Sequence, residues 1–130
     1  MRTDYFKGKI IWITGASSGI GKAFSQALSD KGAFVILSSR RKNILTEVQQ
    51  LLSHPAKSEV VEIDMEDNLS IDSSLEYIGS QHKVDIAILN AGISQRSLAI
   101  DTNLEVEAKI MQTNFTGVVR ATKKLLPGMI

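Results

Sequence analysis

A glycine-rich segment directly after a short apolar run is the feature that most constrains the fold of this chain. The run covers Ile10 to Thr14, and the segment Gly15 to Gly21 reads Gly-Ala-Ser-Ser-Gly-Ile-Gly. Apolar residues then recur at helical spacing until Gly32. Because glycine has no Cβ, such a turn lets backbone N–H groups approach an anion at the N-terminus of a helix. The segment therefore predicts a strand, a phosphate-binding turn and a helix.

Apolar runs and helical periodicity alternate along the rest of the chain. Continuous apolar runs are typical of strands that helices cover on both faces. With two prolines and no low-complexity tract, we expect a single α/β domain over residues 1–130, a Rossmann-type doubly wound parallel sheet containing its first four strands. The further strands are expected at Ala33 to Ser38, Glu59 to Ile63 and Val84 to Leu89, with helices at Ile44 to Leu52 and Ser70 to Gln81.

A long last helix is expected after the fourth strand. Thr102 and Glu105 have the spacing of a capping box, which predicts where the helix begins, and Pro127 predicts where it ends. Asn114 is placed on the side facing the sheet, where a buried amide needs a hydrogen-bond partner. The predicted apolar face consists of Leu104, Ala108, Met111, Phe115, Val118, Thr122 and Leu125.

Composition excludes several classes of function. Lys and Arg total 15 against 14 Asp and Glu, a net charge of +1 that gives no basic stripe for nucleic acid or an anionic membrane. No run approaches the roughly 18 apolar residues of a membrane span. The absence of cysteine excludes disulfides and thiolate metal sites and favours a cytoplasmic location. His54 and His82 have no second ligand at metal-binding spacing, so no metal site is expected.

Polar residues follow each of the four expected strands. Gly15, Ser39, Asp64 and Asn90 come at the four carboxyl ends. In an open parallel sheet these ends border one crevice, in which ligands bind. The four segments are therefore expected to form one binding site.

The motifs together resemble the short-chain dehydrogenase/reductase family. The resemblance rests on Thr14 before G-x-x-x-G-x-G, on Asp64, on Asn90-Ala91-Gly92 and on Asn114. It implies hydride transfer between a nicotinamide cofactor and a carbonyl or alcohol substrate, and a homo-oligomer, dimer or tetramer, in the full-length form. A narrower likeness, to the subgroup around dehydrogenase/reductase member 7, rests on Ser94 to Ser97, Asp101-Thr102 and Leu126-Pro127.

The resemblance assigns a role to each matching residue. It implies that Asp64 and Met65 flank the adenine and that residues 90–93 border the ribose and nicotinamide. Asn114 would belong to a catalytic tetrad, although an Asn that only satisfies backbone groups fits its position equally well. The expected cofactor-binding residues are Gly15, Ser17, Ser18, Gly19, Ile20, Gly21, Ser39, Arg40, Asp64, Met65, Asn90, Ala91, Gly92 and Ile93.

The end of the second strand predicts which nicotinamide cofactor binds. A carboxylate there would accept hydrogen bonds from a ribose 2′-OH, whereas this chain reads Ser38-Ser39-Arg40-Arg41. Arg40 can meet a 2′-phosphate with a charge-assisted contact, which predicts NADP(H), preferred over NAD(H) by roughly 10- to 100-fold. The alternative is a solvated arginine pair before a helix.

The residues that would complete catalysis have no match in their expected place. The family uses a Ser after a fifth strand and a Tyr-x-x-x-Lys pair; Tyr5 and Lys9 have these letters but precede the first strand, so the match is ascribed to chance. We therefore expect the N-terminal, cofactor-binding part of a longer reductase, or a shortened gene product, without turnover of its own. A non-catalytic NADP(H)-binding module and an inactive fragment remain as alternatives.

Overall fold

Four parallel strands form one sheet in the order β3-β2-β1-β4. The structure is a computed structural model and describes residues 4–130. β1 (Ile10–Thr14) lies between β2 (Phe34–Ser38) and β4 (Ile86–Ile88), and β3 (Ser58–Val60) lies beyond β2. The prediction of a doubly wound parallel sheet is confirmed.

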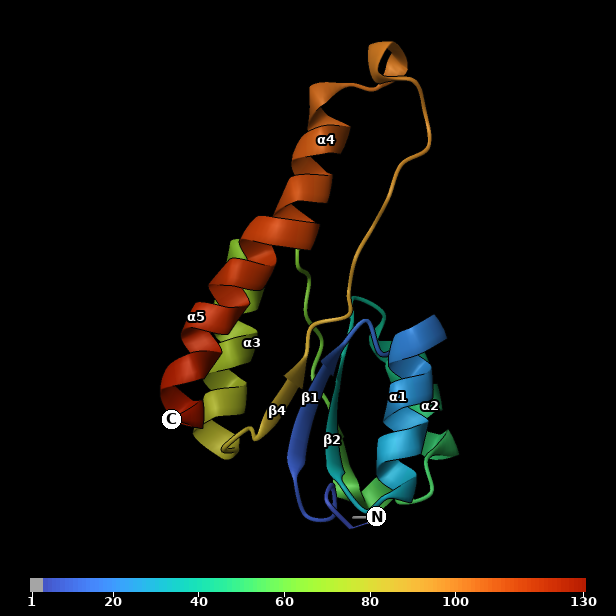
Figure 1. The fold of residues 1–130 in the computed structure, drawn as a ribbon, viewed down its shortest axis with the longest axis vertical. Coiled ribbons are helices and arrows are strands. Elements are labelled where there is room, and N and C mark those ends of the chain that lie inside the picture. Colours follow the sequence, from blue (N-terminus) through green and yellow to red (C-terminus); the bar gives the residue numbers. More distant parts are fainter. Residues whose placement is uncertain (1–3) are drawn as a thin grey trace.

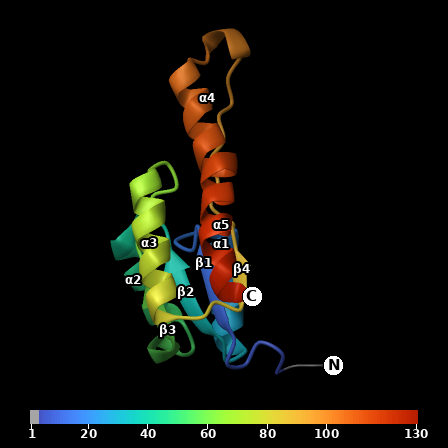
Figure 2. The same ribbon diagram turned by 90° about the vertical axis from the view of Figure 1, so that its left-hand side faces the viewer.

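Helices cover both faces of this sheet (Figure 1). α1 (Gly19–Asp30) and α2 (Lys42–Leu51) pack on one face, and α3 (Asn68–Gln81) and α5 (Gly117–Met129) pack on the other. α4 (Leu104–Met111) continues the line of α5 and extends beyond the sheet, as both Figure 1 and Figure 2 show. The two faces of the sheet therefore have separate cores.

Alternate residues of β1 enter different cores. Trp12 packs against α3 and α5, whereas Ile11 and Ile13 pack against α1 and α2, and all three are fully buried. The Trp12 indole N–H donates to Ser38 Oγ at 2.9 Å, which satisfies the one polar atom of the ring. Burial on both sides explains why the strand sequence is apolar without alternation.

The two outer strands are shorter than predicted. β3 ends at Val60 instead of Ile63, and β4 is confined to the middle of the predicted Val84 to Leu89. The backbone N–H of Val61 nevertheless donates to the carbonyl of Leu37 in β2 at 2.9 Å, and that of Ile63 donates to the carbonyl of Ser39, just after β2, at 3.0 Å. After β3 ends, these two hydrogen bonds keep the chain alongside β2 as far as its carboxyl end.

The start of the last helical segment corrects the predicted capping box. Asn103, not Thr102, caps α4: its Oδ1 accepts the N–H of Val106 at 3.0 Å. The Thr102 hydroxyl instead donates to the carbonyl of Leu98 at 3.0 Å. Asn and Thr are both good N-cap residues, so local sequence does not distinguish these two adjacent positions.

A π-helical turn divides the predicted long helix and changes its buried face. Residues Gln112–Thr116 form this turn, and α5 continues past Pro127 to Met129. The extra residue in the turn rotates the following side chains relative to a regular helix. The predicted face is wrong in its first half, where Leu104, Met111 and Phe115 are exposed. Leu104 and Met111 belong to α4, which extends beyond the sheet, and Phe115 lies in the π-helical turn. The inward face is formed by Thr113, Gly117, Ala121 and Leu125.

A cluster of three polar side chains joins β3 to the end of α3. Tyr77 and His82 both bind the carboxylate of Glu59, the latter at 2.7 Å. Desolvation raises the pKa of Glu59, but the hydrogen bonds from Tyr77 and His82 together with the charge of His82 outweigh it, so the pKa lies below the ordinary value of 4.5. A depressed carboxyl pKa contributes stability above that value and loses it as the pH falls through the folded-state pKa.

Replacing Glu59→Gln should therefore lower the free energy of unfolding at pH 7 by about 0.5 to 1.5 kcal/mol. The difference from the unmodified chain should shrink as the pH falls from about 4.5 through the lowered pKa of Glu59, because the wild-type carboxyl then also becomes protonated. Urea denaturation across this pH range measures it, with the exposed Glu47→Gln on α2 as a control that should change little. A loss that stayed the same from pH 7 down to the lowest pH at which the chain remains folded would contradict this account.

Candidate functional site

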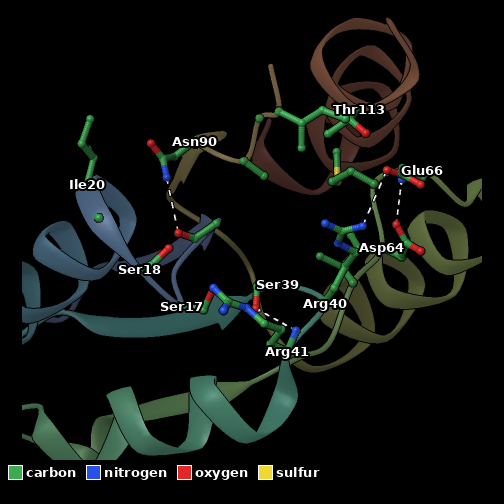
Figure 3. A pocket seen from close by; sticks show the side chains of 17 residues that line it. Ser17, Ser18, Ile20, Ser39, Arg40, Arg41, Asp64, Glu66, Asn90 and Thr113 are labelled. Carbon is green, nitrogen blue, oxygen red and sulfur yellow. Dashed lines mark hydrogen bonds and ion pairs between the residues drawn. The ribbon is translucent and has the colours of Figure 1, made fainter. Parts of the chain in front are cut away.

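A cleft of about 790 Å³ opens where the carboxyl ends of β1, β2 and β4 meet the chain that follows β3 (Figure 3). Its volume is in the range of about 300 to 1,000 Å³ that small-molecule sites occupy. The expected convergence of four strand ends is therefore present. The cleft is lined by Gly15, Ser17, Ser18, Gly19, Ile20, Ser39, Arg40, Arg41, Ile63, Asp64, Met65, Glu66, Asn90, Ala91, Gly92, Ile93 and Thr113.

Two glycines allow the turn after β1 to lie against the end of β4. Gly15 has a φ of +65°, and a Cβ there would lie 2.9 Å from Asn90 Nδ2. A Cβ at Gly21 would lie 2.2 Å from the carbonyl oxygen of Gly15, a distance that no side chain can occupy. Gly21 does not line the cleft, so its part in the site is to let α1 begin directly against the turn.

The third glycine borders the open cleft. Gly19 has a φ of +54°, and no atom lies within 4 Å of where its Cβ would be. The preceding residue, Ser18, is the N-cap of α1 but makes no side-chain cap hydrogen bond, and the first turn contains no acidic residue. The positive end of the α1 dipole thus faces the cleft without an acceptor from its own cap. An anion fits this position.

The segment after β4 is held against the glycine turn by two hydrogen bonds. The N–H of Ala91 donates to Thr14 Oγ1 at 3.0 Å, and Asn90 Nδ2 donates to the carbonyl of Gly15 at 3.4 Å. These contacts place residues 90–93 along the cleft wall opposite the end of β2. The backbone here is close enough that Gly15 could not be replaced without moving it.

The two arginines after β2 have different partners. Arg41 reaches the glycine turn, where its Nη2 donates to Ser17 Oγ at 3.1 Å, and its backbone N–H donates to Ser39 Oγ at 3.1 Å. Arg40, the arginine named from the sequence, lies 3.6 Å from Glu66 instead. Both guanidinium groups line the cleft, so the cationic side of the site contains two side chains.

A tight turn positions the acidic side of the cleft. Asp64 Oδ1 accepts the N–H of Glu66 at 2.9 Å, and the N–H of Asp64 donates to Ser70 Oγ at 2.8 Å. Gln112 Nε2, from the π-helical turn, donates to the carbonyl of Met65 at 3.1 Å. The segment that follows β3 is therefore fixed from α3 and from the π-helical turn.

Asn114 differs from its predicted placement on a buried helix face. It lies in the π-helical turn and is exposed, because the additional residue brings Thr113 inward in its place. Its side chain makes two hydrogen bonds to the backbone of Ile93: Oδ1 accepts the N–H at 2.9 Å and Nδ2 donates to the carbonyl at 2.7 Å. Asn114 thus holds the end of the cleft wall without lining the cleft itself.

Four lining residues were not identified from the sequence. Ile63 and Glu66 flank the predicted pair Asp64-Met65, and Arg41 follows Arg40, so adjacency could have indicated all three. Thr113 could not have been found, because its inward position depends on the π-helical turn. Its hydroxyl is buried and has no hydrogen-bond partner within residues 4–130.

Tyr5, Lys9 and His82, for which the sequence predicts no role in the site, do not line the cleft. Tyr5 and Lys9 contact each other before β1, with the Lys9 ammonium 5.4 Å from the ring centre. His82 binds Glu59 in the polar cluster described above. Over residues 4–130 no group of three or more metal-ligating side chains occurs. In the same part of the chain, no helix has both the length and the apolar character needed to cross a bilayer.

Comparison with known families and proteins identifies the class to which this fold and cleft belong. The family model described as short chain dehydrogenase matches residues 9–130. The chain belongs to the short-chain dehydrogenase family. Human dehydrogenase/reductase SDR family member 7 is 37% identical over 127 residues, which cover 93% of this chain and 38% of the human protein. A member 7-like protein of Anopheles gambiae is 35% identical, covering 97% of this chain and 42% of that protein.

Solved structures of short-chain dehydrogenases have the same arrangement. L-sorbose reductase from Gluconobacter frateurii, solved with NADPH and L-sorbose, has a TM-score of 0.88 at 28% identity, over 98% of this chain and 49% of that chain. A short-chain dehydrogenase/reductase from Mycobacterium marinum has a TM-score of 0.86 at 30% identity, over 95% of this chain and 51% of that one. The chain thus spans about two fifths of the curated relatives' length and about half of these solved chains.

Gly21→Ala tests the close contact on which the cleft depends. Since the new Cβ would meet a backbone carbonyl, we expect the free energy of unfolding to fall by about 1 to 3 kcal/mol or more. The matched control is Gly79→Ala in α3, where no atom lies within 4 Å of the Cβ position. That change should raise the free energy of unfolding by about 0.5 to 1 kcal/mol. Urea denaturation of both variants measures this, and unchanged stability of Gly21→Ala would contradict the contact.

Proposed function

We propose that this chain is the cofactor-binding part of an NADP(H)-dependent oxidoreductase that acts on a carbonyl or alcohol substrate. The observation that carries the proposal is the N-terminus of α1, which faces a cleft of about 790 Å³ without a side-chain cap. The cofactor's pyrophosphate would accept hydrogen bonds from the backbone amides around Gly19, where an open Cβ position allows close approach. Family membership supports a dinucleotide as the anion.

The remaining lining residues would orient the rest of the dinucleotide. Asp64 and Met65 would flank the adenine, because they stand on the wall that the turn after β3 fixes in place. Residues 90–93 would border the ribose and nicotinamide, and Asn114 would keep that wall in position through Ile93. When bound, the nicotinamide supplies or accepts the hydride.

Preference for NADP(H) is part of the proposal. No carboxylate stands at the end of β2 to accept hydrogen bonds from a ribose 2′-OH, and two arginines line the cleft there. A 2′-phosphate would bind Arg40 and Arg41 by charge-assisted contacts. The L-sorbose reductase with similar fold was solved with NADPH, which agrees with this preference.

The 130 residues are expected to bind the cofactor without turning over a substrate. A short-chain dehydrogenase of the predicted kind needs a proton donor beside the nicotinamide. The Tyr-x-x-x-Lys match formed by Tyr5 and Lys9 precedes β1, and those side chains contact each other instead of lining the cleft. The homo-oligomer of the full-length form and the cytoplasmic location stay predictions.

Titration of the purified chain with NADPH and NADH tests the proposal, and Ser18→Asp tests the proposed pyrophosphate position. NADPH should bind roughly 10- to 100-fold more tightly than NADH. The new carboxylate at the N-cap should raise the free energy of unfolding by about 0.3 to 1 kcal/mol, while it weakens binding of both cofactors about fivefold or more by occupying the anion position.

The control for this substitution is Asn103→Asp, which adds the same charge at the N-cap of α4, outside the cleft. It should leave both affinities unchanged. Equal dissociation constants for NADPH and NADH would remove the NADP preference. If Ser18→Asp bound NADPH as tightly as the unmodified chain, the proposal that the pyrophosphate binds at the α1 N-terminus would be contradicted.

A further inference from the structure

The two arginines at the end of β2 are held in unequal ways. Arg41 is hydrogen-bonded to Ser17 of the glycine turn, whereas Arg40 lies beside the carboxylate of Glu66 (Figure 3). Nη1 of Arg40 and Oε1 of Glu66 are 3.6 Å apart, and the two side chains are 58% and 26% exposed. This separation exceeds hydrogen-bond length, so the pair restrains the orientation of Arg40 only weakly.

The backbone of Glu66 is held in place by hydrogen bonds within the turn that follows β3. Its backbone N–H binds Asp64 Oδ1, and the backbone of Asp64 is bound in turn by Ser70 at the start of α3. The backbone of Glu66 is therefore fixed beside the cleft, while the more exposed Arg40 can change partner. The charged residues that line the cleft are two arginines and two acids, Asp64 and Glu66, so their formal charges cancel.

We propose that Glu66 is a specificity-determining residue that weakens binding of a 2′-phosphate by competing for Arg40. The inference rests on the proposed function, because a 2′-phosphate distinguishes NADP(H) from NAD(H). To bind that phosphate, Arg40 must exchange its carboxylate partner for the new anion. A phosphate with nearly two negative charges also approaches the Glu66 carboxylate, and like charges repel. Both effects act against the phosphate and leave a 2′-OH cofactor unaffected.

The alternative is that Glu66 prepares Arg40 for the phosphate by holding its side chain in place. The two possibilities predict opposite signs for the same substitution. Removing a competitor raises the affinity for a 2′-phosphate, whereas removing an orienting partner lowers it. The long separation and the exposure of Arg40 favour competition.

Glu66→Gln separates these possibilities, because it removes the charge and keeps the backbone contact with Asp64. The probes are adenosine 2′,5′-bisphosphate and AMP, titrated into the intact chain by calorimetry. An exposed ion pair corresponds to about a two- to fivefold change in affinity. We expect the bisphosphate to bind more tightly by that factor and AMP to bind as before, and the gain to shrink at high salt.

Two further variants make the result specific. Glu62→Gln removes the same charge from an exposed residue of the same segment that does not line the cleft, and it should change neither affinity. In an Arg40→Ala background, the gain from Glu66→Gln should largely disappear, because Glu66 acts mainly through that arginine.

The outcomes distinguish this inference from the proposed function. If the unmodified chain prefers the bisphosphate to AMP but Glu66→Gln leaves its affinity unchanged or lowers it, the competition is refuted and the cofactor assignment stands. A full gain in the Arg40→Ala background would likewise refute the role of Arg40. If the unmodified chain binds neither probe, both the inference and the proposed function are overturned.

Discussion

Contact between the start of α1 and the end of β4 is the constraint on which the cleft depends. Gly21 stands directly against the carbonyl of Gly15, and Asn90 packs on both. Parallel pairing of β1 with β4 brings these segments together, and the hydrogen bond from Ala91 to Thr14 closes the junction. A side chain at Gly15 or Gly21 would push the turn and β4 apart, and the first amides of α1 would then turn away from the cleft.

The strand order determines which segment brings each charge to the cleft. The glycine turn contributes the positive end of a helix, the segment after β2 contributes two arginines, and the turn after β3 contributes two acids. β2 lies between β1 and β3, so the arginines that follow it can reach the segment after either strand. Arg41 contacts the glycine turn after β1, and Arg40 contacts the turn after β3. The site therefore combines fixed backbone donors with side chains whose partners can change.

Local chemistry explains which parts of this account could be predicted from the sequence. The glycine turn, the four strands and their order along the chain depend on backbone freedom and on burial, and both leave a clear pattern in the residue types. Asp64 and Asn90 directly follow the strands predicted from the sequence, so the predicted fold was enough to place both at the cleft. Asn114 could be named, because the family motif includes it, but its contact with Ile93 could not.

The remaining errors arise where a contact with a distant segment decides the outcome. The π-helical turn is held by Gln112 against Met65, a residue far away in the sequence, and this contact turned Thr113 inward and exposed Phe115. The pairing of Arg40 with Glu66 likewise links two loops that only the sheet order brings together. No local pattern in the sequence contains such information.

Amide chemical shifts recorded during an NADPH titration test the central claim most directly. In a ¹⁵N-labelled sample, the account predicts that the largest shifts occur at the backbone amides of Ser18, Gly19 and Ile20, and that inorganic pyrophosphate perturbs the same amides. If NADPH binds and these three amides remain unperturbed while others shift, the claim that the α1 N-terminus binds the pyrophosphate is contradicted.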